Sequence, residues 1–240
     1  MKRPFRKILR TVWITAGLSF FAWMVYSMQA KNVPNEILKS NQQLSVSEND
    51  FSITFSPANP SDNVIIFYPG ALVQTEAYAP LCRKLAESGH KTTLIKMPFR
   101  LANQGYEIIK EQHILSDKAK KYILAGHSQG GKMAAQFVYE NPDLIDGLIL
   151  LGTTHPRDYD MSDFDIPVLK LYGSNDGVAS AEDVMTNKSK LPSSAKFVLI
   201  EGGNHSQFGY YGFQFNDNDA TISREEQQAL ILNHIREFVD

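Results

Sequence analysis

Six short runs of apolar, β-prone residues recur along the chain, with longer segments between them. Such uniformly apolar runs are typical of strands that are buried on both faces of a parallel sheet. An earlier run, Phe51–Phe55, alternates apolar and polar residues, so we expect a half-exposed strand at a sheet edge. The six runs are Val64–Tyr68, Thr92–Met97, Tyr122–Ala125, Leu148–Leu151, Val168–Tyr172 and Phe197–Ile200.

The segments between the runs have helical periodicity. Glu76–Ser88 places its apolar residues on one helix face and is followed by Gly89, a helix stop. Lys132–Glu140 has a similar apolar face, and a last helix opens with the capping box Ser223-x-x-Glu226. Strands that alternate with helices predict an α/β fold, in which a mostly parallel sheet carries helices on both faces.

The N-terminus differs from the rest of the chain. Thr11–Ala30 contains no charged side chain, and a helix of about 20 residues spans the roughly 30 Å of a bilayer's hydrocarbon core. We therefore expect a transmembrane signal-anchor over residues 1–30, with the membrane as a partner. A basic block precedes the apolar stretch and predicts a cytoplasmic N-terminus with the remaining chain on the extracytoplasmic side. Its residues are Lys2, Arg3, Arg6, Lys7 and Arg10.

A cleaved signal peptide is the alternative, and cleavage would release the protein. Ala30 suits the −1 position of a cleavage site, but Met28 is too large for −3, so we favour retention. Residues 31–50 are polar and read as a tether. The α/β domain is then expected over residues 51–240.

Composition excludes several function classes. A net charge of −2 gives no electrostatic reason to expect nucleic acid as a partner. The chain has one cysteine, Cys82, and no Cys/His cluster with zinc-ligand spacing. We therefore expect no metal and no cofactor.

The sequence Gly126-His127-Ser128-Gln129-Gly130 matches the pattern G-x-S-x-G. It lies directly after one predicted strand and directly before a predicted helix, which is the setting of a nucleophile elbow. The sharp turn exposes the serine hydroxyl at a helix N-terminus, where a developing negative charge is favoured. Ser128 is therefore the predicted nucleophile.

A serine nucleophile needs a base and an orienting acid, which follow it in the order acid, then base, in chains with this elbow. Asp176 follows the run Val168–Tyr172, and His205 follows the run Phe197–Ile200. Both positions lie beyond the carboxyl ends of strands, where open parallel sheets bind ligands. We predict Asp176 as the acid and His205 as the base.

Other residues compete for these two roles. His155 is the rival base, although a place in the pocket lining fits it better. The alternative acids follow the preceding strand and are Asp158, Asp160, Asp163 and Asp165.

An oxyanion hole needs two backbone N–H groups that point to one position. The residue after the nucleophile, Gln129, is expected to supply one of them. The loop after Val64–Tyr68 contains Pro69-Gly70-Ala71, and we expect Ala71 to supply the other.

These motifs in this order resemble the α/β-hydrolase superfamily, and most closely the small bacterial group related to dienelactone hydrolases. The resemblance covers roughly residues 51–240 and includes Asn175-Asp176-Gly177 and the stretch Asn204–Gly209. It implies an acyl-serine intermediate and places Asp176 and His205 as acid and base. Dienelactone hydrolases use cysteine where this chain has Ser128, so their substrate is not carried over.

Only Gly152–Ile166 separates two strands at the place where this fold often carries a lid. We therefore expect an open, lidless site, which favours small or exposed acyl groups in a small-molecule ester. Hydrolysis of a carboxylic ester is the leading interpretation. An acyltransferase, thioesterase or peptidase would use the same groups, and a non-catalytic binding protein on this fold is a third alternative.

Overall fold

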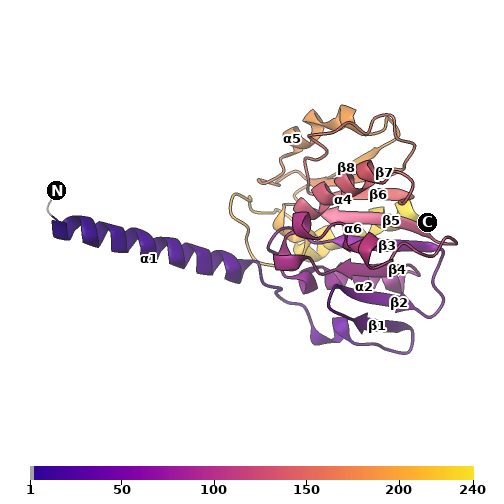
Figure 1. Ribbon diagram of the computed structural model, residues 1–240, viewed down its shortest axis with the longest axis horizontal. Helices are drawn as coiled ribbons and strands as arrows, with labels where there is room; N and C mark the ends of the chain where they lie inside the picture. The colour runs from indigo at the N-terminus through magenta and orange to yellow at the C-terminus, as the bar shows by residue number, and fades with distance from the viewer. Residues whose placement is uncertain (1–2) are drawn as a thin grey trace.

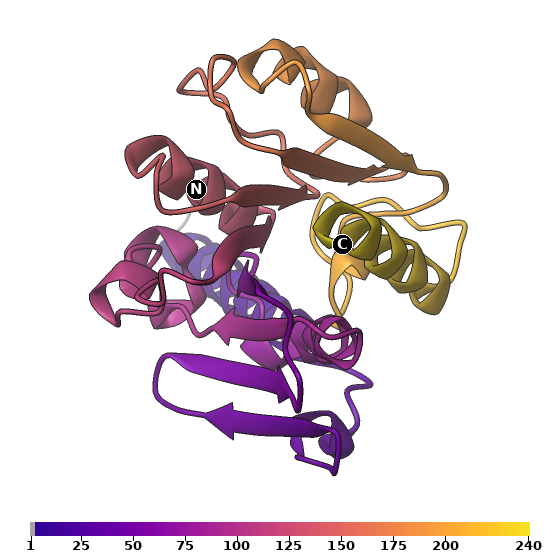
Figure 2. The same ribbon diagram turned by 90° about the vertical axis from the view of Figure 1, so that its right-hand side faces the viewer.

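The computed structural model describes residues 3–240. Eight strands form one sheet in the order β1-β2-β4-β3-β5-β6-β7-β8 (Figures 1 and 2). The first two neighbouring pairs in this order are antiparallel and all later pairs are parallel. The strands are β1 (Leu44–Glu48), β2 (Ser52–Pro57), β3 (Asn63–Tyr68), β4 (Lys91–Ile95), β5 (Lys121–His127), β6 (Gly147–Leu151), β7 (Val168–Gly173) and β8 (Lys196–Ile200).

Helices lie on both faces of this sheet, as the alternation in sequence predicts. The α-helices are α1 (Arg3–Ser27), α2 (Ala79–Glu87), α3 (Ile108–Glu111), α4 (Gln129–Glu140), α5 (Ala181–Thr186) and α6 (Arg224–Val239). Short 3-10 turns are η1 (Asn35–Leu38), η2 (Thr75–Tyr78), η3 (Pro98–Arg100), η4 (Ala102–Gln104), η5 (Lys188–Lys190) and η6 (Ser206–Phe208).

Two hydrophobic clusters lie on opposite faces of the sheet. Along β3, Ile65 and Phe67 belong to the cluster that contains α2 and α6. Val64, Ile66 and Tyr68 of the same strand belong to the cluster that contains α3 and α4. Successive side chains of a strand point to opposite faces, so one apolar run supplies both cores.

The structure corrects two expectations about the start of the domain. β2 is not the sheet edge: Ile53 and Phe55 are fully buried, and β1 is the outer strand that pairs with it. The tether predicted over residues 31–50 contains η1 and β1. Strand β1 forms because Leu44 and Val46 alternate with serines, and Leu44 is buried. Arg83 also fixes this segment, since its guanidinium donates to backbone carbonyls within and just after η1.

The last strand also differs from expectation. β8 was predicted to be buried on both faces, but it is the other edge of the sheet. Its middle residues are only partly buried, and Leu199 is 38% exposed. A uniformly apolar run does not distinguish an edge strand from a central one when the run is only a few residues long.

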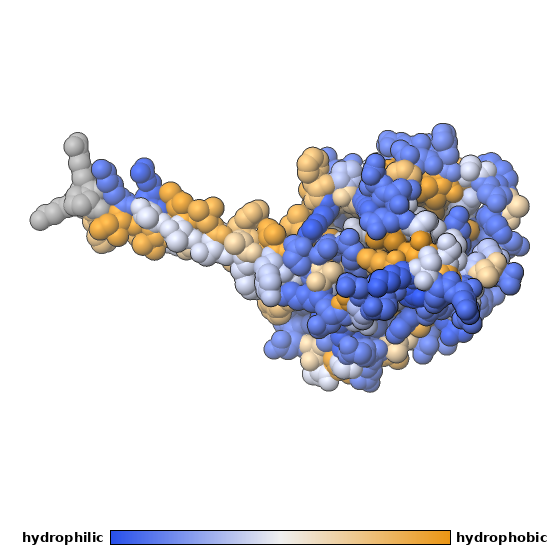
Figure 3. Space-filling model, turned by 90° about the horizontal axis from the view of Figure 1, so that it is seen from below, coloured by the Kyte–Doolittle hydropathy of each residue, from blue (hydrophilic) through white to orange (hydrophobic). Residues whose placement is uncertain are grey.

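α1 projects away from the domain as a long exposed helix (Figure 1). Its stretch Phe5–Ser27 is long and apolar enough to cross a membrane, and its residues are exposed except for half-buried Met24 and buried Ser27 at its end. Figure 3 shows apolar side chains along this helix and hydrophilic ones towards its N-terminal end. Of the basic block, Lys2 lies outside the described residues.

α1 joins the domain at the carboxyl ends of the parallel strands. The C-terminus lies at the other end of the strands, near their amino ends. There the Asn63 side chain at the start of β3 donates to the carbonyl of Val239, 2.7 Å away. In Figure 1 the C-terminus and α1 lie on opposite sides of the sheet. The loops that follow β3, β5, β7 and β8 therefore gather on the α1 side.

Candidate active site

Ser128 occupies a strained turn between β5, which ends at His127, and α4, which begins at Gln129. Its φ of 53° and ψ of −118° lie in a region that side-chain-bearing residues seldom adopt. The Ser128 N–H donates to the carbonyl of Leu151 at the end of β6, 2.9 Å away. Strain of this kind persists only where the surrounding structure imposes it, and it is common at active sites.

Glycines at the two G positions of the motif permit this turn. A Cβ on Gly126 would lie 2.4 Å from the carbonyl carbon of Gly130. A Cβ on Gly130 would lie 2.2 Å from the carbonyl oxygen of Tyr68 on the adjacent strand β3. Both atoms would collide with backbone, which cannot move aside as a flexible side chain can.

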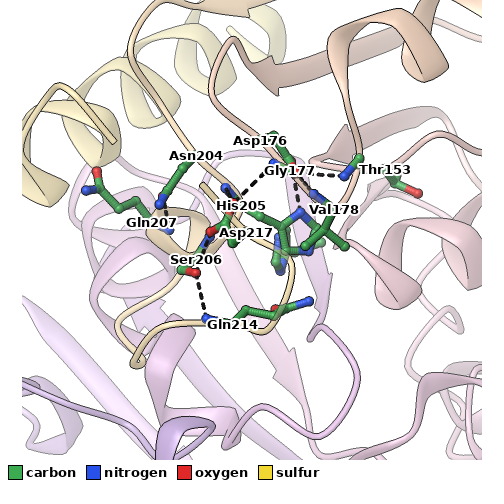
Figure 4. Close-up of polar contacts among 12 residues, drawn as sticks. Thr153, Asp176, Gly177, Val178, Asn204, His205, Ser206, Gln207, Gln214 and Asp217 are labelled. Carbon is green, nitrogen blue, oxygen red and sulfur yellow. Dashed lines mark hydrogen bonds and ion pairs between the residues drawn. The ribbon is translucent and has the colours of Figure 1, made fainter. Parts of the chain in front are cut away.

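His205 and Asp176 form a buried pair at the carboxyl ends of β7 and β8 (Figure 4). His205 Nδ1 lies 2.8 Å from Asp176 Oδ2, and both side chains are fully buried. The other carboxylate oxygen of Asp176 accepts the N–H groups of Val178 and Ala179, at 2.9 and 2.6 Å. The Asp176 carboxylate is therefore held by the backbone of its own loop and contacts the imidazole through its other oxygen.

A second buried carboxylate, Asp217, fixes the loop that carries His205. Its Oδ1 accepts the N–H of His205 at 3.1 Å and that of Gly177 at 3.3 Å. Its Oδ2 accepts both the N–H and the hydroxyl of Ser206, at 2.8 and 2.6 Å. Asp217 thus joins the loop of the acid to the loop of the base (Figure 4). Sequence reasoning missed it, because Asn-Asp-Asn-Asp around it resembles an ordinary polar turn.

Ser128 and His205 line one open pocket with a volume of about 280 Å³. His205 Nε2, the nitrogen not used by Asp176, is buried and bonds to no polar atom among the described residues. The pocket wall from Gly152 to Arg157 comes from the short connection after β6. Ser128 and His205 therefore face a common space, in which Nε2 of the imidazole has no polar partner among the described residues.

The pocket wall is cationic. Lys132, one turn after Ser128 in α4, and Arg157 both line it, and neither forms a salt bridge with any described residue. His155 lines the pocket as well, as expected, and burial lowers its pKa to about 4, with Lys132 and Arg157 acting in the same direction. The rival base is therefore uncharged near neutral pH, and the pocket favours a negative charge on what binds there.

The rival acids do not contact His205. The carboxylate nearest to it is Asp176, and the residues Asp158, Asp160, Asp163 and Asp165 belong to the connection between β6 and β7. Asp160, for example, accepts the N–H of Ser162 within that connection.

The two backbone donors predicted for the oxyanion hole lie on separate loops. Gln129 is the first residue of α4 and lines the pocket with Ser128. Ala71 lies in the loop after β3 and is not among the residues that line this pocket. Its neighbours are engaged: Gly70 N–H donates to Tyr78 Oη at 3.1 Å, and Leu72 N–H donates to the carbonyl of Arg100 at 2.7 Å. Within residues 3–240, the Ala71 N–H donates to no acceptor.

His127 has a structural position that the motif did not predict. It is fully buried, and its Nδ1 lies 2.8 Å from Tyr78 Oη. Its ring centroid lies 4.5 Å from that of His205. Burial, reinforced by His205, lowers the pKa of His127 well below its ordinary value. A neutral ring therefore packs against His205, the predicted base.

No group of three or more metal-ligating side chains is found among the described residues. The single cysteine, Cys82, is fully buried in α2, and burial raises its pKa.

Comparison with known proteins shows which proteins the chain is similar to. No curated protein matches it in sequence. Among solved structures it resembles a CIB-like hydrolase from Thermoplasma acidophilum, with a TM-score of 0.61 and 15% identity over 81% of this chain and 99% of that one. A monoacylglycerol lipase from Paleococcus ferrophilus gives 0.61 and 14%, over 82% and 100% of the two chains. The carboxylesterase CesB from Bacillus subtilis gives 0.56 and 12%, over 93% and 98%.

At these identities the structural likeness establishes the fold. The profile of the alpha/beta hydrolase family matches residues 64–229, which include the elbow and the loops of Asp176 and His205. The chain is therefore an enzyme that belongs to the alpha/beta hydrolase family.

Proposed function

We propose that the protein is a serine esterase in which Ser128 is the nucleophile, His205 the general base and Asp176 the orienting acid. The observation that carries the proposal is the buried His205–Asp176 pair, whose free Nε2 shares a pocket with the strained Ser128. This is the arrangement that activates a serine hydroxyl, which is a weak nucleophile by itself.

The proposed reaction has two steps. The Ser128 hydroxyl attacks the ester carbonyl while His205 Nε2 takes its proton, and the negative oxygen of the tetrahedral intermediate accepts hydrogen bonds from the N–H groups of Gln129 and Ala71. His205 then gives the proton to the departing alcohol, which leaves an acyl-serine. A water molecule, deprotonated by His205, attacks this acyl group, and His205 returns the proton to the Ser128 oxygen as the acid is released.

Ester hydrolysis is preferred over the other acyl transfers for two reasons. The pocket is open to solvent, so water reaches the acyl-enzyme readily. Proteins of similar fold include one named as a monoacylglycerol lipase and one named as a carboxylesterase. The relationship to dienelactone hydrolases remains part of this proposal, with serine as nucleophile, since the buried Cys82 lies in α2 and not at the elbow.

α1 is proposed to be a retained membrane anchor, with the catalytic domain on the extracytoplasmic side. Its end is integrated into the domain: Ser27 and Met28 are buried, and Ala30 forms a β-bridge with Tyr211. Cleavage after Ala30 would remove these contacts from the folded protein. The basic residues near the other end of α1 favour a cytoplasmic N-terminus. The residues 51–240, extended at their start by β1, form the hydrolase domain.

Labelling with a fluorophosphonate probe tests the catalytic proposal. Wild-type protein should be labelled, Ser128→Ala should not, and Ser194→Ala, which removes an exposed serine in the turn before β8, should label normally. A folded wild-type protein that stays unlabelled would refute the esterase mechanism. For the anchor, protease added to intact cells should remove the domain, and full protection would contradict the proposed orientation.

A further inference from the structure

The C-terminal end of α1 is bonded to two of the loops that carry the proposed catalytic groups. In the loop after β3, the Gln74 N–H donates to the carbonyl of Met28 at 2.8 Å, and the Gln74 side chain accepts the N–H of Ala30 at 2.9 Å. In the loop after β8, Tyr210 accepts the N–H of Lys31, and the Gly212 N–H donates to the carbonyl of Ser27, both at 2.7 Å. Residues 27–31, at and directly after the end of the helix, are thus bonded to loops at the carboxyl ends of the strands, where the site lies.

Large apolar side chains surround this attachment and are exposed. We call them the apolar rim; they come from the loops after β3, β4 and β8. Phe99, at a φ of 53°, is 85% exposed, although an exposed phenylalanine in a left-handed conformation gains nothing in water. The members of the rim are Leu72, Phe99, Phe213 and Phe215.

The apolar rim reaches along the side of α1. The ring of Phe215 packs edge-on against that of Phe20, with centroids 5.6 Å apart. Leu72 and Arg100 line an apolar cavity of about 210 Å³ together with Met28 and side chains of the last two turns of α1. Those α1 side chains are Phe21, Met24 and Val25.

These contacts set the depth of the rim if α1 spans a bilayer. The 23 residues of Phe5–Ser27 span about 34 Å as a helix, slightly more than the roughly 30 Å of a hydrocarbon core. Ser27 therefore lies near the membrane surface. Phe20 lies about two helical turns, or about 10 Å, further in, and Phe215 packs against it. Since Phe215 packs against Phe20, the loop that carries Phe215 lies in the same leaflet as this part of α1.

Polar and aromatic residues mark the same boundary. Trp23 and Tyr26 near the end of α1 belong to the residue types that gather at membrane surfaces. The Lys31 ammonium lies 4.0 Å from the centre of the Tyr26 ring, and Arg100 donates to the Gln29 side chain. Two cations therefore lie at the level of the lipid headgroups, whose phosphates are negative.

The catalytic groups lie directly behind the rim. Leu72 adjoins Ala71, the proposed oxyanion donor, and the N–H of Ala102, after Phe99, donates to the Gln129 side chain at 2.9 Å. Phe213 and Phe215 follow His205 in one loop, which Asp217 bonds back to the His205 backbone. The rim thus adjoins or contacts three of the four loops that carry proposed catalytic groups, those of Ala71, Gln129 and His205.

From this geometry we infer that the catalytic edge is embedded in the surface of the bilayer and that the substrate is an amphiphilic ester that resides there. The inference rests on the proposed serine esterase and on the proposed anchor. It also accounts for an open site on a lipid hydrolase: the acyl tail stays among the lipids, so no buried tunnel in the protein is needed to hold it. A water-soluble ester reaches the same serine from the solvent side.

The position of the rim is tested first, without reference to activity. Full-length protein in phosphatidylcholine–phosphatidylglycerol vesicles carries a spin label on Phe99→Cys, Phe213→Cys or Phe215→Cys, with Leu230→Cys on α6 as the matched exposed control. Cys82 is fully buried and should stay unlabelled. At the three rim positions relaxation by oxygen should exceed relaxation by a water-soluble nickel complex, and the control should show the reverse. The inference would be overturned if the rim labels were as accessible to the nickel complex as the control label is. This holds whether the rim is in contact with water or with a second copy of the chain.

The substrate class is tested in the same vesicles with two probes. One is a fluorogenic long-chain glycerolipid ester diluted into the bilayer, and the other is water-soluble p-nitrophenyl butyrate. Phe99→Asn together with Phe215→Ser should reduce hydrolysis of the lipid ester about tenfold, because the favourable free energy of transferring each ring from water into lipid is lost. The soluble ester should be cleaved at the wild-type rate. Asparagine is chosen at position 99 because it tolerates positive φ. Leu230→Ser should alter neither rate.

The outcomes separate the two proposals. Cleavage of the soluble ester without cleavage of any bilayer ester would overturn the inference and leave the esterase proposal intact. Equal losses of hydrolysis rate on both probes in the rim variant would also overturn it. The rim side chains would then stabilise the active site and would not contact the lipid. No cleavage of either probe, together with no fluorophosphonate labelling, would refute the esterase proposal and with it the inference.

Discussion

The hydroxyl of Tyr78 lies 2.8 Å from Nδ1 of His127, the residue before Ser128, and it accepts the N–H of Gly70. Burial keeps the His127 ring neutral, so the Tyr78 hydroxyl can donate to Nδ1 while it accepts from Gly70. One phenol therefore connects the elbow to the loop of the proposed oxyanion donor Ala71. The rings of His127 and His205 then pack 4.5 Å apart.

Tyr78→Phe should weaken both the fold and the reaction. The change leaves the Gly70 N–H and the His127 Nδ1 buried without partners, which should lower the free energy of unfolding by about 1–3 kcal/mol. Because Gly70 adjoins Ala71, kcat should fall more than KM changes. Urea unfolding and steady-state kinetics measure the two effects. A stable variant with unchanged kcat would show that this contact does not position the oxyanion loop.

Asp176→Asn should remove most of the activity without unfolding the protein. An amide can accept the Val178 and Ala179 N–H groups but cannot balance the positive charge that forms on His205. By analogy with the serine protease triad, kcat should fall by about 10⁴ with little change in KM. Asp219→Asn, in the same polar turn as Asp217, is the control and should retain wild-type kcat. A loss of less than tenfold in Asp176→Asn would remove Asp176 from the triad.

Lys170 should make the stability of the protein depend on pH. Its side chain is fully buried in β7 and donates to the carbonyl of His155 at 2.6 Å, and burial lowers its pKa to about 7 from the ordinary 10.5. Between these two values the unfolded chain binds more protons than the folded one, so stability rises with pH. The rise, at most about 1.4 kcal/mol per pH unit, should be absent in Lys170→Met.

Denaturant unfolding of both proteins from pH 6.5 to 9.5 measures this difference. Lys196→Met, which removes an exposed lysine at the start of β8, serves as the control and should keep the wild-type slope. Parallel pH profiles for wild type and Lys170→Met would contradict the prediction.

The cationic pocket wall should favour anionic esters. Lys132 and Arg157 line the pocket without a carboxylate partner among residues 3–240. Lys132→Gln should therefore lower kcat/KM for an ester that carries a negative charge about tenfold, as expected of one partly exposed charge contact. A neutral ester of the same size should be much less affected. Added salt should reduce the difference between the two esters in the wild type. Equal losses on both esters would contradict an electrostatic role.

Much of this architecture could be predicted from local sequence. The uniformly apolar runs predict β3 to β7, and the glycines around Ser128 predict the elbow, because those features depend on neighbours in the chain. β1 was missed because Leu-Ser-Val-Ser is short and half polar, and only its pairing with β2 buries Leu44. The edge position of β8 was missed because strand order is set by tertiary packing.

The unpredicted parts of the site depend on long-range contacts. Asp217 was missed because its function depends on bonds to Gly177, His205 and Ser206, which no spacing in the sequence reveals. Likewise, nothing in the apolar stretch of α1 shows that its end is bonded to Gln74 and Tyr210. The sequence therefore predicts an anchor, but not that residues 27–31 are bonded to loops of the proposed site.

The central claim is an acyl-enzyme on Ser128, and rapid mixing with p-nitrophenyl butyrate tests it most directly. The account predicts a burst of one nitrophenolate per protein and, after acid quenching, a butyryl group on the peptide that contains Ser128. No burst and no acylated peptide, or a butyryl group on any other residue, would contradict it.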